Sequence, residues 1–217
     1  MDLLKVLQSR YTTKAYDANK TIPAEKFEQL LAMLRLAPSS INIQPWHFII
    51  ADHVAAKQRI TKALVGKYAY NAPKVLDSSH TILFCTKADI DAQHLEQLLA
   101  QDEISGRFKD EQAKQGQKDT RKGYIEYYRN EKGDIQRWDE NQTFIALGQM
   151  LLAAGIENID ATPIGGFNEE ILDQELQLTA QGLVPSVILT LGYRSEQDFN
   201  AKLPKSRLAE DLIFTRL

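Results

Sequence analysis

Apolar residues recur at helical spacing in three segments of the N-terminal third of the chain. Residues 2–8, 23–37 and 54–65 each place their aliphatic side chains three or four positions apart, which is the period of one helix face. Pro23 opens the second segment and Pro38 follows its end. The apolar faces are formed by Leu3, Leu4 and Leu7, then Phe27, Leu30, Leu31 and Leu34, then Ala56, Ile60 and Leu64. The pattern predicts three amphipathic helices.

Short apolar runs indicate the strands. Residues 47–51, 80–86 and 186–191 are compact and apolar, which is typical of strands buried on both faces. A fourth run, residues 212–215, predicts a terminal strand that must pair with a sheet edge of its own chain or of another subunit. Residues 161–167 contain two adjacent glycines and are predicted to form a tight glycine loop.

Two later segments differ in polarity. Residues 91–138 carry dense charge of both signs and several glycines, which predicts solvated helices broken by turns. Residues 143–156 are apolar on nearly every face, so we expect this helix in the core or in a subunit interface. No repeat or boundary divides the chain, which predicts a single domain over residues 1–217. We expect an α+β fold, a three-layer sandwich with a mixed β-sheet flanked by helices.

The composition narrows the possible partners. A net charge of −3 and a pI near 5.9 argue against nonspecific nucleic-acid binding, which needs a basic surplus. The single cysteine, Cys85, lies in an apolar run and is expected to pack rather than react, which fits a reducing compartment. The N-terminus lacks a signal-peptide pattern, and no window is apolar enough to span a membrane. We therefore expect a soluble, cytoplasmic protein that binds neither nucleic acid nor membranes.

Several common catalytic patterns are missing from the sequence. The four histidines, His47, His53, His80 and His94, show no metal-ligand spacing, so no metal site is expected. The sequence also lacks a Gly-x-Ser-x-Gly elbow, a Walker pattern and a Gly-x-Gly-x-x-Gly fingerprint. A phosphate or dinucleotide would have to be held in another way.

The most distinctive stretch lies between the second helix and the first strand. Pro38 and Pro45 stiffen its two ends, and short polar side chains project between them. These side chains are Ser39, Ser40, Asn42 and Gln44. Their hydroxyl and amide groups suit a planar, hydrogen-bonding ligand.

Basic residues occur in pairs at both ends of the chain. Arg10 and Lys14 are spaced i, i+4 after the first helix, while Lys205 and Arg207 alternate in an extended segment and so face one side. The four cations could converge on one dianionic phosphate, with the arginine forks binding bidentately. Each pair taken alone is more often part of a solvated surface.

Further polar groups suit the edge of a ring system. The amides of Asn42, Gln44 and Asn71 offer both donors and acceptors, which match alternating C=O and N–H groups on a pyrimidine-like edge. Lys74 could stabilise an anionic reduced ring, and the adjacent glycines at 165 and 166 let backbone N–H groups approach closely. The alternative interpretations are loop capping by the amides and a simple turn at the glycines.

In this order and with these spacings, the motifs resemble the bacterial oxygen-insensitive NAD(P)H nitroreductases. The resemblance covers essentially the whole chain, and the Pro-Ser-Ser-x-Asn-x-Gln-Pro-Trp run is its most specific part. The motifs are Arg10-x-x-x-Lys14, Pro38-Ser39-Ser40-x-Asn42-x-Gln44-Pro45-Trp46, Asn71-x-x-Lys74, Pro163-Ile164-x-Gly166-Phe167 and Leu203-Pro204-Lys205-Ser206-Arg207. The resemblance implies an FMN-dependent homodimer of the nitroreductase fold, with flavins at the subunit interface and the C-terminal strand exchanged.

The resemblance also implies which residues bind the flavin. They are Arg10, Tyr11, Thr12, Lys14, Pro38, Ser39, Ser40, Asn42, Asn71, Lys74, Pro163, Ile164, Gly165, Gly166, Lys205 and Arg207. The ribityl phosphate would be held by Arg10, Thr12, Lys14, Lys205 and Arg207. Asn71 and Lys74 would bind the ring edge, and the backbone of residues 165 and 166 would lie near the hydride-carrying nitrogen. Residues 39, 40 and 42 would reach the flavin of the partner subunit.

By the same likeness, the activity is ping-pong hydride transfer from NADH or NADPH, through FMN, to a nitroaromatic, quinone, pterin or flavin. No catalytic side chain is expected, because the cofactor carries the chemistry. The pocket for donor and acceptor is expected to be lined by Ile41, Tyr68, Tyr70, Arg107 and Tyr124, groups that are equally plausible as surface residues.

Two departures from the family pattern and two rival functions bear on this prediction. Relatives carry Glu where this chain has Gly165 and Phe where it has Tyr124, so the acceptor range is the least transferable property. The rival functions are a flavin or dihydropteridine reductase on the same fold, and a noncatalytic flavin-binding protein.

Overall fold

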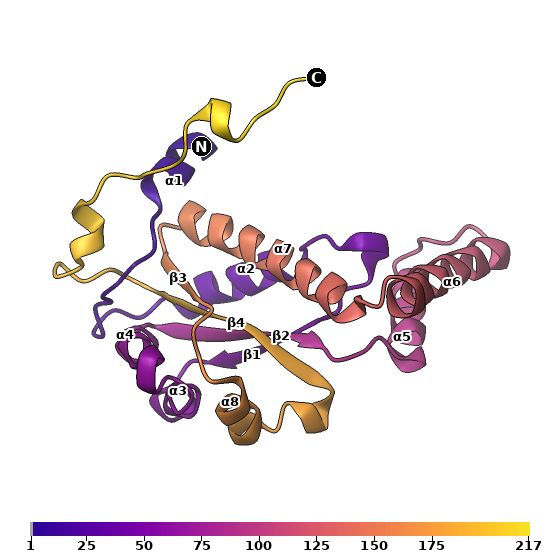
Figure 1. The fold of residues 1–217 in the computed structure, drawn as a ribbon, viewed down its shortest axis with the longest axis horizontal. Helices are drawn as coiled ribbons and strands as arrows, with labels where there is room; N and C mark the ends of the chain where they lie inside the picture. The colour runs from indigo at the N-terminus through magenta and orange to yellow at the C-terminus, as the bar shows by residue number, and fades with distance from the viewer. Residues whose placement is uncertain (1) are drawn as a thin grey trace.

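In the computed structural model, which describes residues 2–217, a four-stranded sheet lies between two layers of helices (Figure 1). The strands are β1 (Trp46–Ala51), β2 (His80–Lys87), β3 (Asp160–Ile164) and β4 (Leu183–Gly192), in the spatial order β1-β2-β4-β3. Each neighbouring pair is antiparallel, so the predicted mixed sheet is wrong. Burial on both faces does not determine strand direction, and the parallel pairing within residues 2–217 is a bridge between Thr12 and Ala161.

The helices cover both faces of the sheet. They are α1 (Leu3–Ser9), α2 (Ala24–Arg35), α3 (Val54–Thr61), α4 (Ala72–Asp77), α5 (Ala92–Ile104), α6 (Glu111–Glu126), α7 (Ile135–Ile156) and α8 (Glu169–Leu176), with a π-helical turn at Tyr127–Glu131. Figure 1 shows α2 and α7 on one face, α3, α4 and α8 on the other, and α5 and α6 extending beyond the sheet. The predicted three layers are therefore confirmed.

The alternation of side chains along β2 divides the core into two parts. Ile82 and Phe84 pack into a cluster with α2 and α7, while Leu83 and Cys85 pack into a second cluster with α3 and α8. All four are fully buried, and each aliphatic or aromatic side chain buried in this way contributes roughly 1.5–3 kcal/mol. Burial also raises the pKa of the Cys85 thiol, as expected for a cysteine that packs rather than reacts.

Two prolines lie in strands rather than in loops. The predicted glycine loop over residues 161–167 is wrong in its first part, because residues 160–164 form β3. Pro163 is compatible with this strand since β3 is at the sheet edge, where a missing N–H need not be paired. Strand β4 is longer than the predicted 186–191 and includes Pro185. Pro185 lies opposite Cys85, next to a shift in the register of β2 and β4. The two glycines after β3 alone form the predicted turn.

The C-terminal segment is not a strand in this chain. Residues 210–212 form a 3-10 turn, and residues 213–217 have no regular structure. Figure 1 shows this segment beside α1 and away from the sheet. Leu212, Ile213 and Phe214 are exposed.

Within a single chain, helix α7, whose residues 143–156 are apolar on nearly every face, is buried on one side only. In α7 the residues Ala146, Met150 and Ala154 are buried, but Phe144 and Ile145 remain 45% and 46% exposed. Helix α1, predicted as amphipathic, has no buried residue at all. The two helices therefore leave apolar faces uncovered.

The charged segment forms the predicted solvated helices. Gly106 and Gly133 have positive φ angles of 71° and 64° and lie where α5 ends and before α7 begins. Gly116 and Gly123 instead lie within α6. The arm made by α5 and α6 packs against the rest of the chain through a cluster that includes Ile43, Ile90 and Trp138.

Candidate functional site

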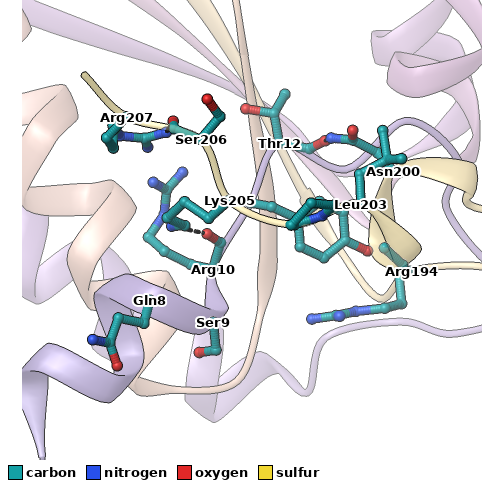
Figure 2. A pocket seen from close by; sticks show the side chains of 13 residues that line it. Gln8, Ser9, Arg10, Thr12, Arg194, Asn200, Leu203, Lys205, Ser206 and Arg207 are labelled. Atoms are coloured by element: carbon teal, nitrogen blue, oxygen red, sulfur yellow. Dashed lines mark hydrogen bonds between the residues drawn. The ribbon is translucent and has the colours of Figure 1, made fainter. Parts of the chain in front are cut away.

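A polar cavity of about 280 Å³ lies between the end of α1 and the C-terminal segment. Arg10, Lys205 and Arg207 line it together with Tyr11 and Thr12, which the sequence also assigned to the flavin. Figure 2 shows the three cations gathered on one side and Arg194 on the other. The structure thus brings together most of the predicted phosphate-binding residues from opposite ends of the chain.

The three cations lie close enough for their charges to interact, and within residues 2–217 none of them forms an ion pair with a carboxylate. Burial and then the nearby Arg207 lower the pKa of Arg10, while burial, Arg10 and Arg207 lower the pKa of Lys205. No carboxylate contributes to either shift. A cluster of cations without a carboxylate among the causes of these shifts is suited to hold an anion, and we refer to this hollow as the anion cavity.

Hydrogen bonds fix the walls of this cavity. The Lys205 ammonium donates to the carbonyl oxygens of Leu7 and Arg10, the latter at 2.5 Å, and so ties the C-terminal segment to the end of α1. The Asn200 amide donates to the Thr12 carbonyl oxygen at 2.7 Å. These contacts preorganise the cavity by joining the N-terminal and C-terminal segments of the chain.

A second pair of contacts orients Tyr11. Its hydroxyl donates to the buried carboxylate of Asp198 at 2.9 Å, and the guanidinium of Arg194 lies 4.8 Å from its ring centroid. Arg194 is ion-paired with Asp160 at 2.6 Å. Burial, followed by the hydrogen bond to Asp198, raises the pKa of Tyr11 to about 12, so this phenol stays protonated.

Lys14 lies apart from the other predicted phosphate ligands. It does not line the cavity of Arg10, and its charge instead acts on Lys74, whose pKa is lowered by burial and then by Lys14. Within one chain, three of the four cations therefore line the same cavity, and the assignment of Lys14 to the phosphate stays a prediction. Spacing i, i+4 places two residues on one side only within a helix, and residues 10–14 are not helical.

The predicted ring-edge residues form a second, compact cluster. Asn71 ends a 3-10 turn at Gly66–Asn71, and Lys74 lies in α4. The Lys74 ammonium donates to the Asn71 carboxamide oxygen at 2.8 Å and to the Tyr70 carbonyl oxygen at 2.9 Å. The Asn71 amide donates to the carbonyl oxygen of Gly166 at 3.3 Å. This network joins α4 to the turn that follows β3.

The two glycines of that turn differ in their surroundings. A Cβ on Gly166 would lie 2.9 Å from Cδ1 of Tyr68, whereas a Cβ on Gly165 would meet nothing within 4 Å. Only the second glycine is thus required by close approach. Pro163 and Ile164 precede it in β3, where Ile164 is buried.

The polar stretch after Pro38 forms a tight turn with unusual backbone angles. Ile41, Asn42 and Gln44 have φ angles of 48°, 55° and 46°, in the left-handed region that residues other than glycine rarely adopt. Ser39 accepts a hydrogen bond from the Gln44 backbone N–H at 3.0 Å, and the Ser40 N–H donates to the side-chain oxygen of Gln142 at 2.9 Å. We refer to residues 39–44 as the polar turn.

Within a single chain, the polar turn lies far from the anion cavity. Arg10 packs against Gly155, since a Cβ there would lie 3.7 Å from Cβ of Arg10, whereas Ser40 contacts Gln142. These two residues stand 13 apart on α7, which corresponds to about 20 Å along the helix. Figure 1 agrees, with Ser40–Asn42 near α5 and α6, and α1 at the opposite end of α7.

The predicted pocket residues divide between the same two regions. Tyr68 and Tyr70 lie beside the Lys74 cluster, and Tyr70 is exposed over the Lys74 ammonium at 4.5 Å. Ile41, Arg107 and Tyr124 belong to the polar turn and the α5–α6 arm. Tyr124 lines an apolar hollow on α6 with Gly123 and Tyr127.

Several supporting residues are invisible in the sequence patterns. Asp198 and Asn200 orient the cavity walls, and Asp102, Arg121 and Gln142 support the polar turn. Arg121 is fully buried, although a charged residue in a charged helix is normally solvated. Its partner Asp102 lies 19 positions away, and no pattern in the sequence indicates that the two residues pair.

Comparison with known proteins agrees with this geometry. A profile described as the nitroreductase family matches residues 7–193. The chain belongs to the nitroreductase family. It is 40% identical over 215 residues to the oxygen-insensitive NAD(P)H nitroreductase of Enterobacter cloacae, with 99% of each chain covered. It is 37% identical over 217 residues to the Salmonella typhimurium protein of that name, with 100% of each covered.

A flavin oxidoreductase and solved structures extend the comparison. The chain is also 35% identical over 209 residues to the major NAD(P)H-flavin oxidoreductase of Aliivibrio fischeri, with 95% of each chain covered. A nitroreductase family protein from Streptococcus pneumoniae shares the fold with a TM-score of 0.82 at 21% identity, over 100% of both chains. A protein from Exiguobacterium sibiricum, described as a nitroreductase and solved in complex with FMN, has a TM-score of 0.82 at 23% identity, over 100% of this chain and 98% of that one.

Within residues 2–217, no helix is both long and apolar enough to cross a membrane.

Proposed function

We propose that this nitroreductase is an FMN-dependent enzyme that uses NADH or NADPH to reduce nitroaromatics, quinones or related acceptors. The observation that carries the proposal is the cavity of Arg10, Lys205 and Arg207, which has cations and no carboxylate partner. A phosphate dianion would supply the missing counter-charge. The names of the full-length relatives, which specify NAD(P)H and in one case flavin, support the same assignment.

The residues of the two clusters fit the two ends of FMN, the phosphate and the ring. Arg10, Thr12, Lys205 and Arg207 would hold the phosphate, with the two arginines able to bind it bidentately. Lys74 and Asn71 would hold the polar edge of the ring, and Lys14 joins them because its charge acts on Lys74. When bound, FMN supplies the hydride-transfer chemistry, so the protein needs no catalytic acid or base.

The chain's own residues bind, orient and exclude water. The absence of a side chain at Gly166 leaves its backbone within reach of a flat ligand, and Tyr68 closes the space beside it. Tyr68, Tyr70, Ile41, Arg107 and Tyr124 are proposed to line the pocket that takes NAD(P)H and the acceptor in turn.

The functional unit is proposed to be a homodimer. The polar turn meets α7 at Gln142, about 20 Å along the helix from Gly155, beside which Arg10 lies. This separation is compatible with Ser39, Ser40 and Asn42 contacting the flavin of the partner subunit. The uncovered faces of α1 and α7 would pack in that interface. The apolar C-terminal segment would then pair, as an exchanged strand, with the sheet of the other subunit.

A simple experiment tests the catalytic proposal. Purified protein should be yellow, and its flavin absorbance should bleach anaerobically on addition of NADH or NADPH, then return when a quinone or nitroaromatic is added. Flavin that stays oxidised with both donors would identify a noncatalytic flavin-binding protein instead. A preference of at least tenfold in kcat/KM for free flavin or a dihydropteridine over quinones and nitroaromatics, about 1.4 kcal/mol in transition-state binding, would favour a dedicated reductase for those compounds.

A further inference from the structure

The polar turn is held in its conformation by residues from three helices. Its left-handed residues Ile41, Asn42 and Gln44 include a β-branched side chain, for which a positive φ is a marked outlier. Such a backbone persists only where the surrounding structure determines it, and it occurs preferentially at ligand sites. The contacts that determine it are therefore candidates for control of the site.

Two of these contacts reach the backbone of the turn from the arm. Nε of Arg121, on α6, donates to the carbonyl oxygen of Ile41 at 3.2 Å. The imidazole Nε2 of His94, on α5, is 2.7 Å from the carbonyl oxygen of Ile43, so this nitrogen carries the proton and donates. The carbonyls on either side of Asn42 are thus both held.

Asp102 connects this support to a predicted pocket residue. Its Oδ2 accepts from Nη2 of Arg121 at 2.6 Å, and its Oδ1 is 3.3 Å from Nε of Arg107. Asp102 and Arg121 are almost completely buried, whereas Arg107 is 62% exposed. A single carboxylate therefore links Arg107 to the carbonyl of Ile41 through Arg121.

The remaining features of Arg121 argue against a purely electrostatic role. Its Nη1 has no hydrogen-bond partner within residues 2–217, although the side chain is fully buried. Burial of an incompletely paired guanidinium is costly, and an apolar side chain would fill the same space without that cost. The geometry that the guanidinium imposes on the Ile41 carbonyl gives a reason for its presence.

We propose that the buried Asp102–Arg121 pair is a positioning unit, which fixes the polar turn and aims Arg107, and so sets acceptor and flavin binding. This inference rests on the proposed function, in which the polar turn contacts FMN and Ile41 and Arg107 line the pocket. Neither Asp102 nor Arg121 touches substrate in this scheme. They act through the backbone of Ile41 and the side chain of Arg107.

The test compares three variants of the FMN-loaded protein. Arg121→Met removes both contacts, and Asp102→Asn keeps an acceptor oxygen but removes the charge, which makes it the milder change. Arg129→Met is the matched control, because Arg129 also bridges a carboxylate and a backbone carbonyl, those of Asp89 at 2.5 Å and Ile90 at 3.0 Å, but not the polar turn. For each we would measure FMN affinity, the absorption spectrum of bound FMN, and KM and kcat for a quinone acceptor.

We expect both Asp102 and Arg121 variants to raise the acceptor KM by about ten- to a hundredfold, with a smaller effect on kcat, and to shift the bound-flavin spectrum. Arg129→Met should leave all of these unchanged. A lowered Tm with parental KM, spectrum and FMN affinity would mean that the pair only stabilises the arm, and would overturn the inference. If Arg121→Met does not fold, Asp102→Asn alone decides. Parental protein without FMN or reductase activity would instead overturn the proposed function, and this inference with it.

Discussion

The buried ammonium of Lys74 donates a hydrogen bond of 2.8 Å to the side-chain oxygen of Asn71. The amide nitrogen of Asn71 in turn donates to the carbonyl oxygen of Gly166, so one carboxamide orients both a cation and a glycine turn. Burial lowers the pKa of Lys74, and the nearby cation Lys14 lowers it further. This is an arrangement that would favour negative charge on a bound ring.

Asn71→Ala should therefore lower turnover by about tenfold while changing FMN occupancy much less, because the phosphate site is untouched. Asn200→Ala is the converse control, since Asn200 donates to Thr12 in the anion cavity and should change occupancy more than turnover. Steady-state rates per bound flavin and the flavin-to-protein ratio are the two measurements. Parental turnover in the Asn71 variant would count against its role at the ring.

The anion cavity predicts strong dependence of flavin retention on its cations. Lys205→Ala combined with Arg207→Ala should lower FMN affinity by at least tenfold and leave the circular dichroism spectrum unchanged, since both residues lie in the exposed C-terminal segment outside the core. Part of the loss will arise from the C-terminal segment, which Lys205 ties to Arg10. Arg59→Ala with Lys62→Ala removes the same charge at the C-terminal end of α3, where both side chains pair with Glu175, and should not affect flavin binding. Equal occupancy in the two double variants would refute the phosphate assignment.

The glycine turn offers a prediction with a built-in control. Gly165→Ala should be tolerated, because a Cβ there meets no heavy atom within 4 Å and its φ is not positive. Gly166→Ala should displace the Tyr68 ring, whose Cδ1 would lie 2.9 Å away, and raise the KM for NADH or acceptor. The two variants differ by one position, so KM values that respond equally would show that close approach at residue 166 is not needed.

The sequence predicts the components of this site better than their arrangement. Local signals are sufficient for helices α2 and α3, which bury the predicted apolar faces, because each depends on a few neighbouring residues. The position of Lys14 and the direction of the strands depend on contacts between distant segments, as in the bridge from Thr12 to Ala161. The buried Asp102 and Arg121 pair is of the same kind, since neither residue differs in type from its solvated neighbours.

Apolar residues on α7 predict self-association. Light scattering should give a mass of twice 24.6 kDa, and Phe144→Glu with Ile145→Glu should shift the protein toward monomer and lower flavin occupancy. Val54→Glu is a suitable control because Val54 is exposed on α3, on the opposite face of the sheet. A dimer that survives both glutamates at parental affinity would place the interface elsewhere.

Asp139 predicts a pH dependence of stability. Both carboxylate oxygens are buried without a hydrogen-bond partner within residues 2–217, and burial, followed by the nearby Asp89, raises the pKa of Asp139 to about 7. Arg129 opposes this shift. Because the folded state favours the protonated acid, the stabilisation is fully present below the unfolded pKa of about 4 and is lost as the pH rises through about 7.

The free energy of unfolding should therefore fall between pH 5.5 and 8.5 by an amount on the order of 1–4 kcal/mol, and Asp139→Asn should remove most of this slope. The variant should gain more stability at pH 8.5 than at pH 5.5, because only the higher pH places a charge in the unpaired site. Urea titrations at both pH values measure the effect, with Glu140→Gln as the neighbouring control for loss of one negative charge. A slope in the Asn variant equal to that of the parent would assign the titration to another group.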